Sequence, residues 1–397
     1  MKMKTIEIKR NSNIEDIDSL YASFFNTINE LDEYKIILPK KIDNLFYSMN
    51  VSLLQFVSTI FKTGRLKTIQ VKIDSNNRTE IDDVYDEEFF FPIISLLWNE
   101  VNIIDINEDN IRLILREYQN AFFKKMKSSK SMKGEKFILA NLDHFSEEKG
   151  ILKIFENNGE FNSNEYSFKK SIEGIIKDEV LKFSLNNQSQ FEKIKDDISS
   201  IIYELMKNTF EWAKHDKSGK IINPNIRGVY FKFHKYGIDN ILNDYKNTFP
   251  IFQYFADSNL SINSKKEVYF IEISVFDTGL GFVDRYNGIG NDIDIIKKCL
   301  IKNQTSSVSN LKDKKGLGLD RILNILNDKG LFKINTDKYS LYRNLKIDKY
   351  NSEVGLNDLS RIVLKDWNNS SVKDIKPKKF KFSGTTISIL YPFSQTN

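Results

Sequence analysis

The second half of the chain alternates between helical and strand patterns, and this alternation limits the fold more than any other feature of the sequence. Apolar side chains recur at helical spacing across about 188–214. Segments with the alternating or β-branched content of strands follow, separated by two further helical patterns. The strands are predicted at 227–235, 267–277, 331–335 and 385–391, and the helices near 291–301 and 317–328. This order predicts an α/β fold in which helices and a sheet form a two-layer sandwich.

The first 130 residues or so read as a smaller α/β unit. The predicted elements are strands at 34–39 and 67–73, and helices at 51–63, 87–100 and 108–127. One strand–helix–strand of this unit resembles the STAS-type modules of bacterial regulators. We therefore predict a small regulatory or interaction domain over 1–130 and a second domain over 135–397.

Composition narrows the class of protein. The 59 basic and 54 acidic residues leave a formal charge of +5, which is a small excess for this length, so we do not expect direct binding of nucleic acid. Cys299 is the only cysteine, which excludes an intramolecular disulfide and a cysteine-based zinc site. The most apolar stretch, Phe89 to Trp98, is too short to span a bilayer, and the N-terminal residues lack the apolar core of a signal peptide. We expect a cytoplasmic protein without membrane contact.

Glu204 and Asn208 form the first of four motifs and lie on the long predicted helix. They are four residues apart, so they stack on one face beside the apolar stripe. A carboxylate and a neutral amide suit a magnesium–water site, because the amide oxygen can ligate a hard cation and the carboxylate can take a proton from water. A solvated polar pair is the alternative for this motif by itself.

Asp277 ends a predicted strand and is followed at once by Gly279 and Gly281. Period-2 alternation places this acid on the same sheet face as the apolar residues that precede it. Such an acid can accept a hydrogen bond from an exocyclic amine, while the glycines let the backbone approach a flat ring. A simple strand-ending turn is the alternative.

Gly316 and Gly318 open the predicted helix near 317–328. Glycines at a helix start expose backbone N–H groups, and the helix dipole favours an anion there. This predicts a phosphate site without the P-loop pattern, which the chain lacks; a glycine cap or tight turn is the alternative. The fourth motif, Ser383-Gly-Thr-Thr-Ile, reads by itself as an ordinary strand.

Together and in this order, the four motifs resemble those of the GHKL superfamily, which includes DNA gyrase B subunits, heat-shock chaperones of that fold, histidine kinases and mismatch-repair ATPases. ELMKNTFEWA resembles the N box of that superfamily, FDTGLGF its first glycine box, KKGLGLDRI its second and SGTTISILYP its closing strand. A stretch similar to its lid lies between Phe282 and Lys315. The resemblance covers residues 190–397 and implies a histidine kinase-like ATPase domain, the Bergerat type of sandwich.

The resemblance also implies a role for each matching residue, with ATP and Mg²⁺ as cofactors. Asn208 would hold Mg²⁺ that bridges the phosphates, Glu204 would orient or deprotonate the attacking water, and Asp277 would read the adenine amine. The other residues implied to bind the nucleotide are Gly279, Gly281, Thr305, Ser306, Lys315, Gly316, Leu317, Gly318, Leu319, Thr385 and Thr386.

The N-box segment departs from the family pattern at Glu211 and Trp212, where many relatives carry His, Lys or Asp. We interpret Trp212 as completing the core; packing under the nucleotide is the alternative. None of the three histidines, His144, His215 and His234, lies on paired dimerisation helices, which disfavours a self-contained histidine kinase.

Three uses of ATP remain open. The first is an ATPase whose nucleotide orders the 282–315 lid and acts as a conformational switch in a bacterial regulatory or defence-type system. The second is a kinase acting on a separate partner, as in anti-sigma-type serine kinases of the same fold. The third is an adaptor that binds nucleotide without hydrolysis, which Glu204 disfavours because binding alone needs no general base. We expect a protein partner encoded nearby, and many relatives form homodimers.

Overall fold

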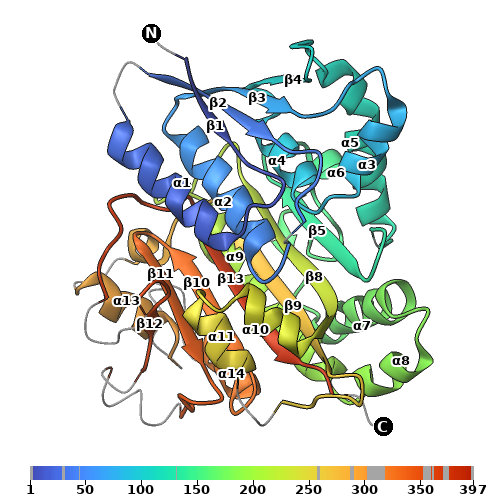
Figure 1. Ribbon diagram of the computed structural model, residues 1–397, viewed down its shortest axis with the longest axis vertical. Coiled ribbons are helices and arrows are strands. Elements are labelled where there is room, and N and C mark those ends of the chain that lie inside the picture. Colours follow the sequence, from blue (N-terminus) through green and yellow to red (C-terminus); the bar gives the residue numbers. More distant parts are fainter. Residues whose placement is uncertain are drawn as a thin grey trace.

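The computed structural model describes residues 3–28, 32–43, 45–130, 132–256, 260–286, 290–301, 318–351, 359, 362–369 and 375–394. Across these ranges the chain is a mixed α/β protein with one parallel and one larger antiparallel sheet (Figure 1). The α/β class predicted from the sequence is therefore confirmed.

The first sheet is parallel, with the strand order β1-β2-β3-β4. Its strands are β1 (Met3–Glu7), β2 (Glu33–Leu38), β3 (Leu66–Val71) and β4 (Asn102–Ile104). The helices of this region are α1 (Ile14–Thr27), α2 (Met49–Lys62), α3 (Arg78–Tyr85), α4 (Phe90–Leu97) and α5 (Arg112–Lys127). Ile36, Ile69 and Ile103 are partners across the strands and are fully buried, so this row faces the helices and holds the sheet against them.

The second sheet is antiparallel and seven-stranded, with the order β12-β11-β10-β13-β9-β8-β5. Its strands are β5 (Lys136–Leu142), β8 (Ile226–Gly237), β9 (Glu267–Asp277), β10 (Leu331–Thr336), β11 (Tyr339–Asn344), β12 (Lys365–Asp366) and β13 (Thr385–Pro392). A separate hairpin pairs β6 (Glu156–Asn157) with β7 (Glu160–Phe161). The four strands predicted in this half of the chain correspond to β8, β9, β10 and β13.

One face of the antiparallel sheet carries α9, which contacts β8, β9 and the helix α14. The helices of this half are α6 (Glu147–Gly150), α7 (Glu165–Ile175), α8 (Leu185–Phe191), α9 (Lys195–Ala213), α10 (Ile238–Asp244), α11 (Phe249–Phe255), α12 (Phe282–Arg285), α13 (Asp292–Cys299) and α14 (Gly318–Leu326), and a π-helical turn, η1 (Ile176–Val180), continues α7. The single helical pattern predicted from 188 is divided into α8 and α9, because the chain turns between Glu192 and Ile194.

The opposite face of the same sheet is covered by α2 from the N-terminal region (Figure 1). Every residue from Met49 to Ile60 is buried, and the helix contacts α1 and α4 on one side and β9 and β13 on the other. The antiparallel sheet thus has helices on both faces. The predicted two-layer sandwich is therefore incomplete, because α2 adds a third layer on the second face. The boundary predicted between residues 130 and 135 falls between α5 and β5, but α2 packs against elements on both sides of it.

Candidate functional site

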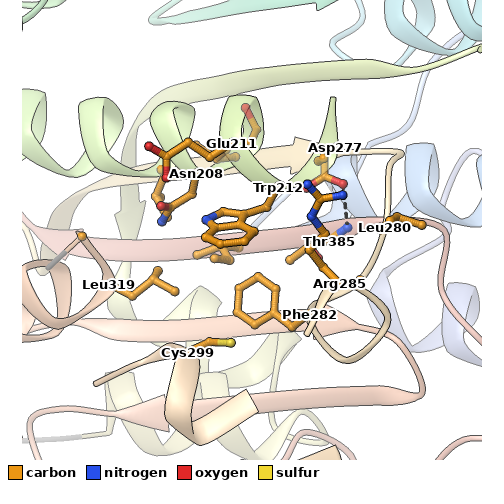
Figure 2. Close-up of a pocket in the computed structure, with 17 residues that line it drawn as sticks. Asn208, Glu211, Trp212, Asp277, Leu280, Phe282, Arg285, Cys299, Leu319 and Thr385 are labelled. Atoms are coloured by element: carbon orange, nitrogen blue, oxygen red, sulfur yellow. Dashed lines mark hydrogen bonds between the residues drawn. The ribbon is translucent and has the colours of Figure 1, made fainter. Parts of the chain in front are cut away.

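A pocket opens between α9, the first turn of α14 and the ends of β9 and β13 (Figure 2). Several residues that the sequence singled out line it, although they lie far apart along the chain. These residues are Asn208, Asp277, Gly281, Gly318, Leu319 and Thr385. Leu205, Val275 and Ile387 provide apolar wall, so the pocket combines an apolar surface with a few polar groups, as ligand sites do.

Asp277 lies at one end of the pocket, and its carboxyl group is held by backbone donors. Its Oδ1 accepts hydrogen bonds from the N–H groups of Gly279 at 3.0 Å and Thr385 at 3.2 Å. Burial raises the pKa of Asp277 to about 7, against the opposing effect of these donors. No described residue donates a hydrogen bond to Oδ2, so this oxygen is free to accept one from a ligand.

Glu204 and Asn208 face the start of α14, as their spacing on one helix face predicts. A Cβ atom added to Gly318 would lie 2.9 Å from Glu204 Oε2 and 3.5 Å from Asn208 Nδ2. A side chain at position 318 would therefore have to displace the Glu204 carboxylate. The glycine allows the backbone of α14 to approach the acid–amide pair closely.

Arg321, at the end of the first turn of α14, binds Glu204, a contact that no sequence pattern indicated. Its Nη1 lies 3.1 Å from Glu204 Oε1 and 2.9 Å from Glu165 Oε1, and its Nη2 donates to Ser200 Oγ at 3.1 Å. Glu204 Oε1 is thereby fixed, while Oε2 receives no hydrogen bond from any residue that the structure describes.

The Asn208 amide differs from most buried or half-buried polar groups of the protein. Asn208 is half-buried and lines the pocket, yet its amide forms no hydrogen bond with any described residue. Polar groups removed from water normally have a partner. An amide oxygen left open in a pocket is therefore available as a ligand for a cation or as an acceptor.

The two glycines after Asp277 are required by packing within the protein. A Cβ atom at Gly279 would lie 2.3 Å from the carbonyl oxygen of Ala213, and one at Gly281 would lie 2.4 Å from Asp337 Oδ1. Gly281 lines the pocket, whereas Gly279 is not among the lining residues. Close approach to the end of α9 therefore explains Gly279, which the sequence interpretation had placed beside a flat ring.

Thr385 and Thr386 point to opposite faces of the sheet, as neighbours in a strand do. Thr385 lines the pocket, and its hydroxyl lies 2.9 Å from that of Thr336. Thr386 instead donates to Gln55 Oε1 of α2 at 3.4 Å, so the structure does not bring it to the pocket. The remaining predicted residues, Thr305, Ser306, Lys315, Gly316 and Leu317, lie outside the residues that the structure describes.

Trp212 belongs to the pocket, and the interpretation that it completes the core is wrong. The residue is half-buried, and Figure 2 shows its indole among the lining side chains, near Phe282. Arg285 lies over it, with 5.9 Å between the guanidinium carbon and the ring centroid, and donates to the carbonyl oxygens of His215 and Asp216. Trp212 follows Asn208 by one helical turn, so the spacing that paired Glu204 with Asn208 also indicated this position.

Cys299 also lines the pocket. Burial, together with the negative charge of Asp337, raises the pKa of the Cys299 thiol to about 12, so the thiol remains protonated at neutral pH. A thiolate nucleophile is therefore not available at this position.

A buried ionic cluster supports the end of α9 beside the pocket. Arg227 Nη2 lies 2.5 Å from Asp143 Oδ1 and 2.6 Å from Glu156 Oε1, and Lys214 Nζ lies 2.6 Å from Glu156 Oε2. Asn225 Nδ2 donates both to Asp143 Oδ2 of this cluster at 2.7 Å and to the carbonyl oxygen of Ala213 at 2.9 Å. All of these charges are paired, so the cluster fixes the backbone against which Gly279 packs.

No protein-family model matches the chain, and no curated protein or solved structure matches it either. Within the part of the chain that the structure describes, no helix combines the length and apolar character needed to cross a membrane. Any functional assignment therefore depends on the motifs and on the geometry of the pocket.

Proposed function

We propose that the chain binds ATP together with Mg²⁺ in this pocket, hydrolyses it, and uses the nucleotide as a conformational switch. The main support is the convergence of Asn208, Asp277, Gly318 and Thr385 on one pocket, with Glu204 beside them. These residues come from four separate segments of the chain, α9, β9, α14 and β13. Their arrangement agrees with the roles that the GHKL resemblance implies.

The Asp277 end of the pocket suits a purine base. Asp277 Oδ2 can accept a hydrogen bond from an exocyclic amine such as that of adenine. Val275 and Ile387 offer apolar contact to a ring, and Trp212 and Phe282 supply aromatic surface. Aromatic and apolar walls with one fixed acceptor favour a flat, amine-bearing heterocycle.

The Asn208 end suits a phosphate chain with its cation. The N-terminus of α14 directs backbone N–H groups and the positive end of the helix dipole toward this region. Nucleotide-bound Mg²⁺ takes only one or two protein ligands and keeps several waters, and the open amide of Asn208 fits that requirement. The ion would supply charge neutralisation at the phosphate oxygens.

The Glu204 carboxylate is oriented so that it can position or deprotonate a water molecule. Arg321 holds Oε1, which leaves Oε2 facing the first turn of α14. From there the carboxylate would orient a water molecule or take its proton, while helix N–H groups stabilise phosphate charge. Phosphoryl transfer depends mainly on such positioning and electrostatics.

The test uses the purified full chain. ATP binding with Mg²⁺ is measured by isothermal titration calorimetry, with GTP and CTP as matched nucleotides, and ADP release is followed over time. We expect saturable ATP binding that weakens when Mg²⁺ is chelated, and slow ADP release. Absence of ATP binding at millimolar nucleotide would refute the proposal, and binding without ADP release would refute hydrolysis.

A further inference from the structure

Lys62 is the last residue of α2 and lies outside all four motifs, yet its ammonium group contacts the turn that follows Asp277. Its Nζ donates to the carbonyl oxygen of Thr278, and lies 3.4 Å from that of Gly279. The N–H of Gly279 is in turn one of the two donors to Asp277 Oδ1. Lys62 thus holds the same turn that holds the Asp277 carboxyl group.

Three segments meet at this point. Gly384, just before Thr385, has a φ of +66° and packs so tightly that a Cβ atom would lie 2.1 Å from the carbonyl oxygen of Asp277. The preceding residue, Ser383, is fastened to α2 by Ser58, with 2.7 Å between the two hydroxyl oxygens. The end of α2 is therefore fixed in place relative to the base end of the pocket.

The charge of Lys62 acts on Asp277 more freely than that of the other nearby cation. Arg227 also acts on Asp277, but it is bound to Asp143 and Glu156. Lys62 has no carboxylate within ion-pair distance among the described residues. Burial lowers the pKa of Lys62 to about 8, so the group is still largely protonated at neutral pH.

The remaining charges near Lys62 form a pair of their own. Asp284 of α12 and Lys381, which precedes β13, both act on Lys62 with opposite sign. They bind each other, and Lys381 also lies 3.8 Å from Asp337 Oδ1. Their effects on Lys62 therefore largely cancel, and Asp277 is the group that its charge influences.

We propose that Lys62 is a positioning residue for nucleotide recognition, which holds the Thr278–Gly279 turn and favours the ionised form of Asp277, the form that accepts a hydrogen bond from the adenine amine. This inference rests on the proposed function. If Lys62 has this role, the N-terminal region supplies a residue to the nucleotide site. A movement of α2 would then change the position of the Thr278–Gly279 turn at the Asp277 end of the pocket.

The experiment compares the full-length wild type with Lys62→Met, which keeps the stem without the charge, and Lys62→Arg, which keeps the charge. Lys67→Met is the matched control, because Lys67 lies close in sequence and its ammonium group donates to the carbonyl oxygen of Gly64 at 3.0 Å, away from the pocket lining. Affinity for Mg·ATP is measured by calorimetry from pH 6 to pH 9. Melting temperatures are recorded for all four proteins.

Lys62→Met should weaken ATP binding by roughly threefold to tenfold at pH 7, and shift the rise of affinity with pH to higher pH. The wild type and Lys62→Met should approach each other near pH 9, where Asp277 is largely ionised in both and Lys62 loses its own charge, and Lys62→Arg should follow the wild type. Lys67→Met should match the wild type throughout.

Three outcomes would overturn the inference, and they differ from one another. An unchanged affinity and pH profile in Lys62→Met would leave ATP binding standing and remove Lys62 from the site. An equal loss at every pH, with a lower melting temperature, would show a purely structural lysine. A wild type that does not bind ATP would remove the proposed function together with this inference.

Discussion

The two faces of the antiparallel sheet both carry polar side chains, and they differ in how the groups on the central strand β9 and around the pocket are paired. On the face toward α2, Glu272 accepts the Ser48 N–H at 2.8 Å with one oxygen and lies 2.9 Å from His234 Nε2 with the other. On the face toward α9, the Asn208 amide and Asp277 Oδ2 receive no hydrogen bond from any described residue. Polar groups withdrawn from water are costly unless they are paired, so the paired Glu272 carboxylate serves the fold, whereas open groups that also line a pocket indicate a ligand.

The largest effect is expected from Asn208→Ala. The substitution removes the one open amide oxygen at the phosphate end, so measurable Mg·ATP binding should be lost. The melting temperature without nucleotide should not change, because the amide makes no hydrogen bond with the described residues. Calorimetry and a thermal melt test the two halves of this prediction. Retained Mg·ATP affinity would break the distinction between open and paired groups.

Glu204→Ala should separate turnover from binding. Loss of a general base lowers the rate of the chemical step by about 10²–10⁴-fold, while ATP affinity should change little. Glu165→Ala is the control, since it removes the other carboxylate partner of Arg321 at 2.9 Å without altering the pocket lining. Phosphate release is the measurement. Normal turnover in the Glu204 variant would remove its assigned role.

The helical period of the sequence located α9, which buries one regular face. The β-branched and aromatic content of the strands located β8, β9, β10 and β13, although β9, β10 and β13 are buried on both faces. The same reasoning could not find the partner of α2, whose segment is buried on all sides. Periodicity shows that a helix is buried, and it does not show which sheet covers it. The parallel and antiparallel sheets are joined across α2 by contacts between residues hundreds of positions apart.

Motif matching located the pocket, but the structure differs from the sequence interpretation at three residues. Gly279 packs against Ala213 and does not line the pocket. Thr386 belongs to the motif but faces α2, because adjacent residues of a strand alternate. Trp212 was assigned to the core although its spacing from Asn208 directed it to the pocket. Arg321 and Lys62 could not be found from sequence, since each reaches the site from an element whose packing only the structure defines.

Asp277→Asn should lower affinity and raise stability. The substitution loses the ionised acceptor, so ATP affinity should fall by about tenfold at pH 8, and its rise with pH near 7 should flatten. Burial raises the pKa of Asp277 from 3.8 to about 7, so the folded state holds a proton that the unfolded chain releases. This group therefore destabilises the fold as pH rises from about 4 through about 7.

The Asp277→Asn variant should accordingly unfold at higher denaturant concentration than the wild type at pH 8, by about 1–3 kcal/mol, and match it near pH 4. Urea unfolding at the two pH values is the measurement. Equal stability at both would mean that the carboxyl group is not held in the buried state described above.

The smallest effect is expected on the face toward α2. Tyr47 is fully buried, and its hydroxyl donates to the carbonyl oxygen of Ser388 at 3.0 Å. Tyr47→Phe should lower the free energy of unfolding by about 1 kcal/mol, which is typical for one buried hydrogen bond, and leave Mg·ATP affinity unchanged. Tyr166→Phe, at a side chain that is 69% exposed, makes the same chemical change and should alter neither quantity. A hydrogen bond that serves only the fold should affect the free energy of unfolding and leave the ATP affinity unchanged. If Tyr47→Phe instead weakened ATP binding while the free energy of unfolding stayed the same, the face toward α2 would belong to the site as well.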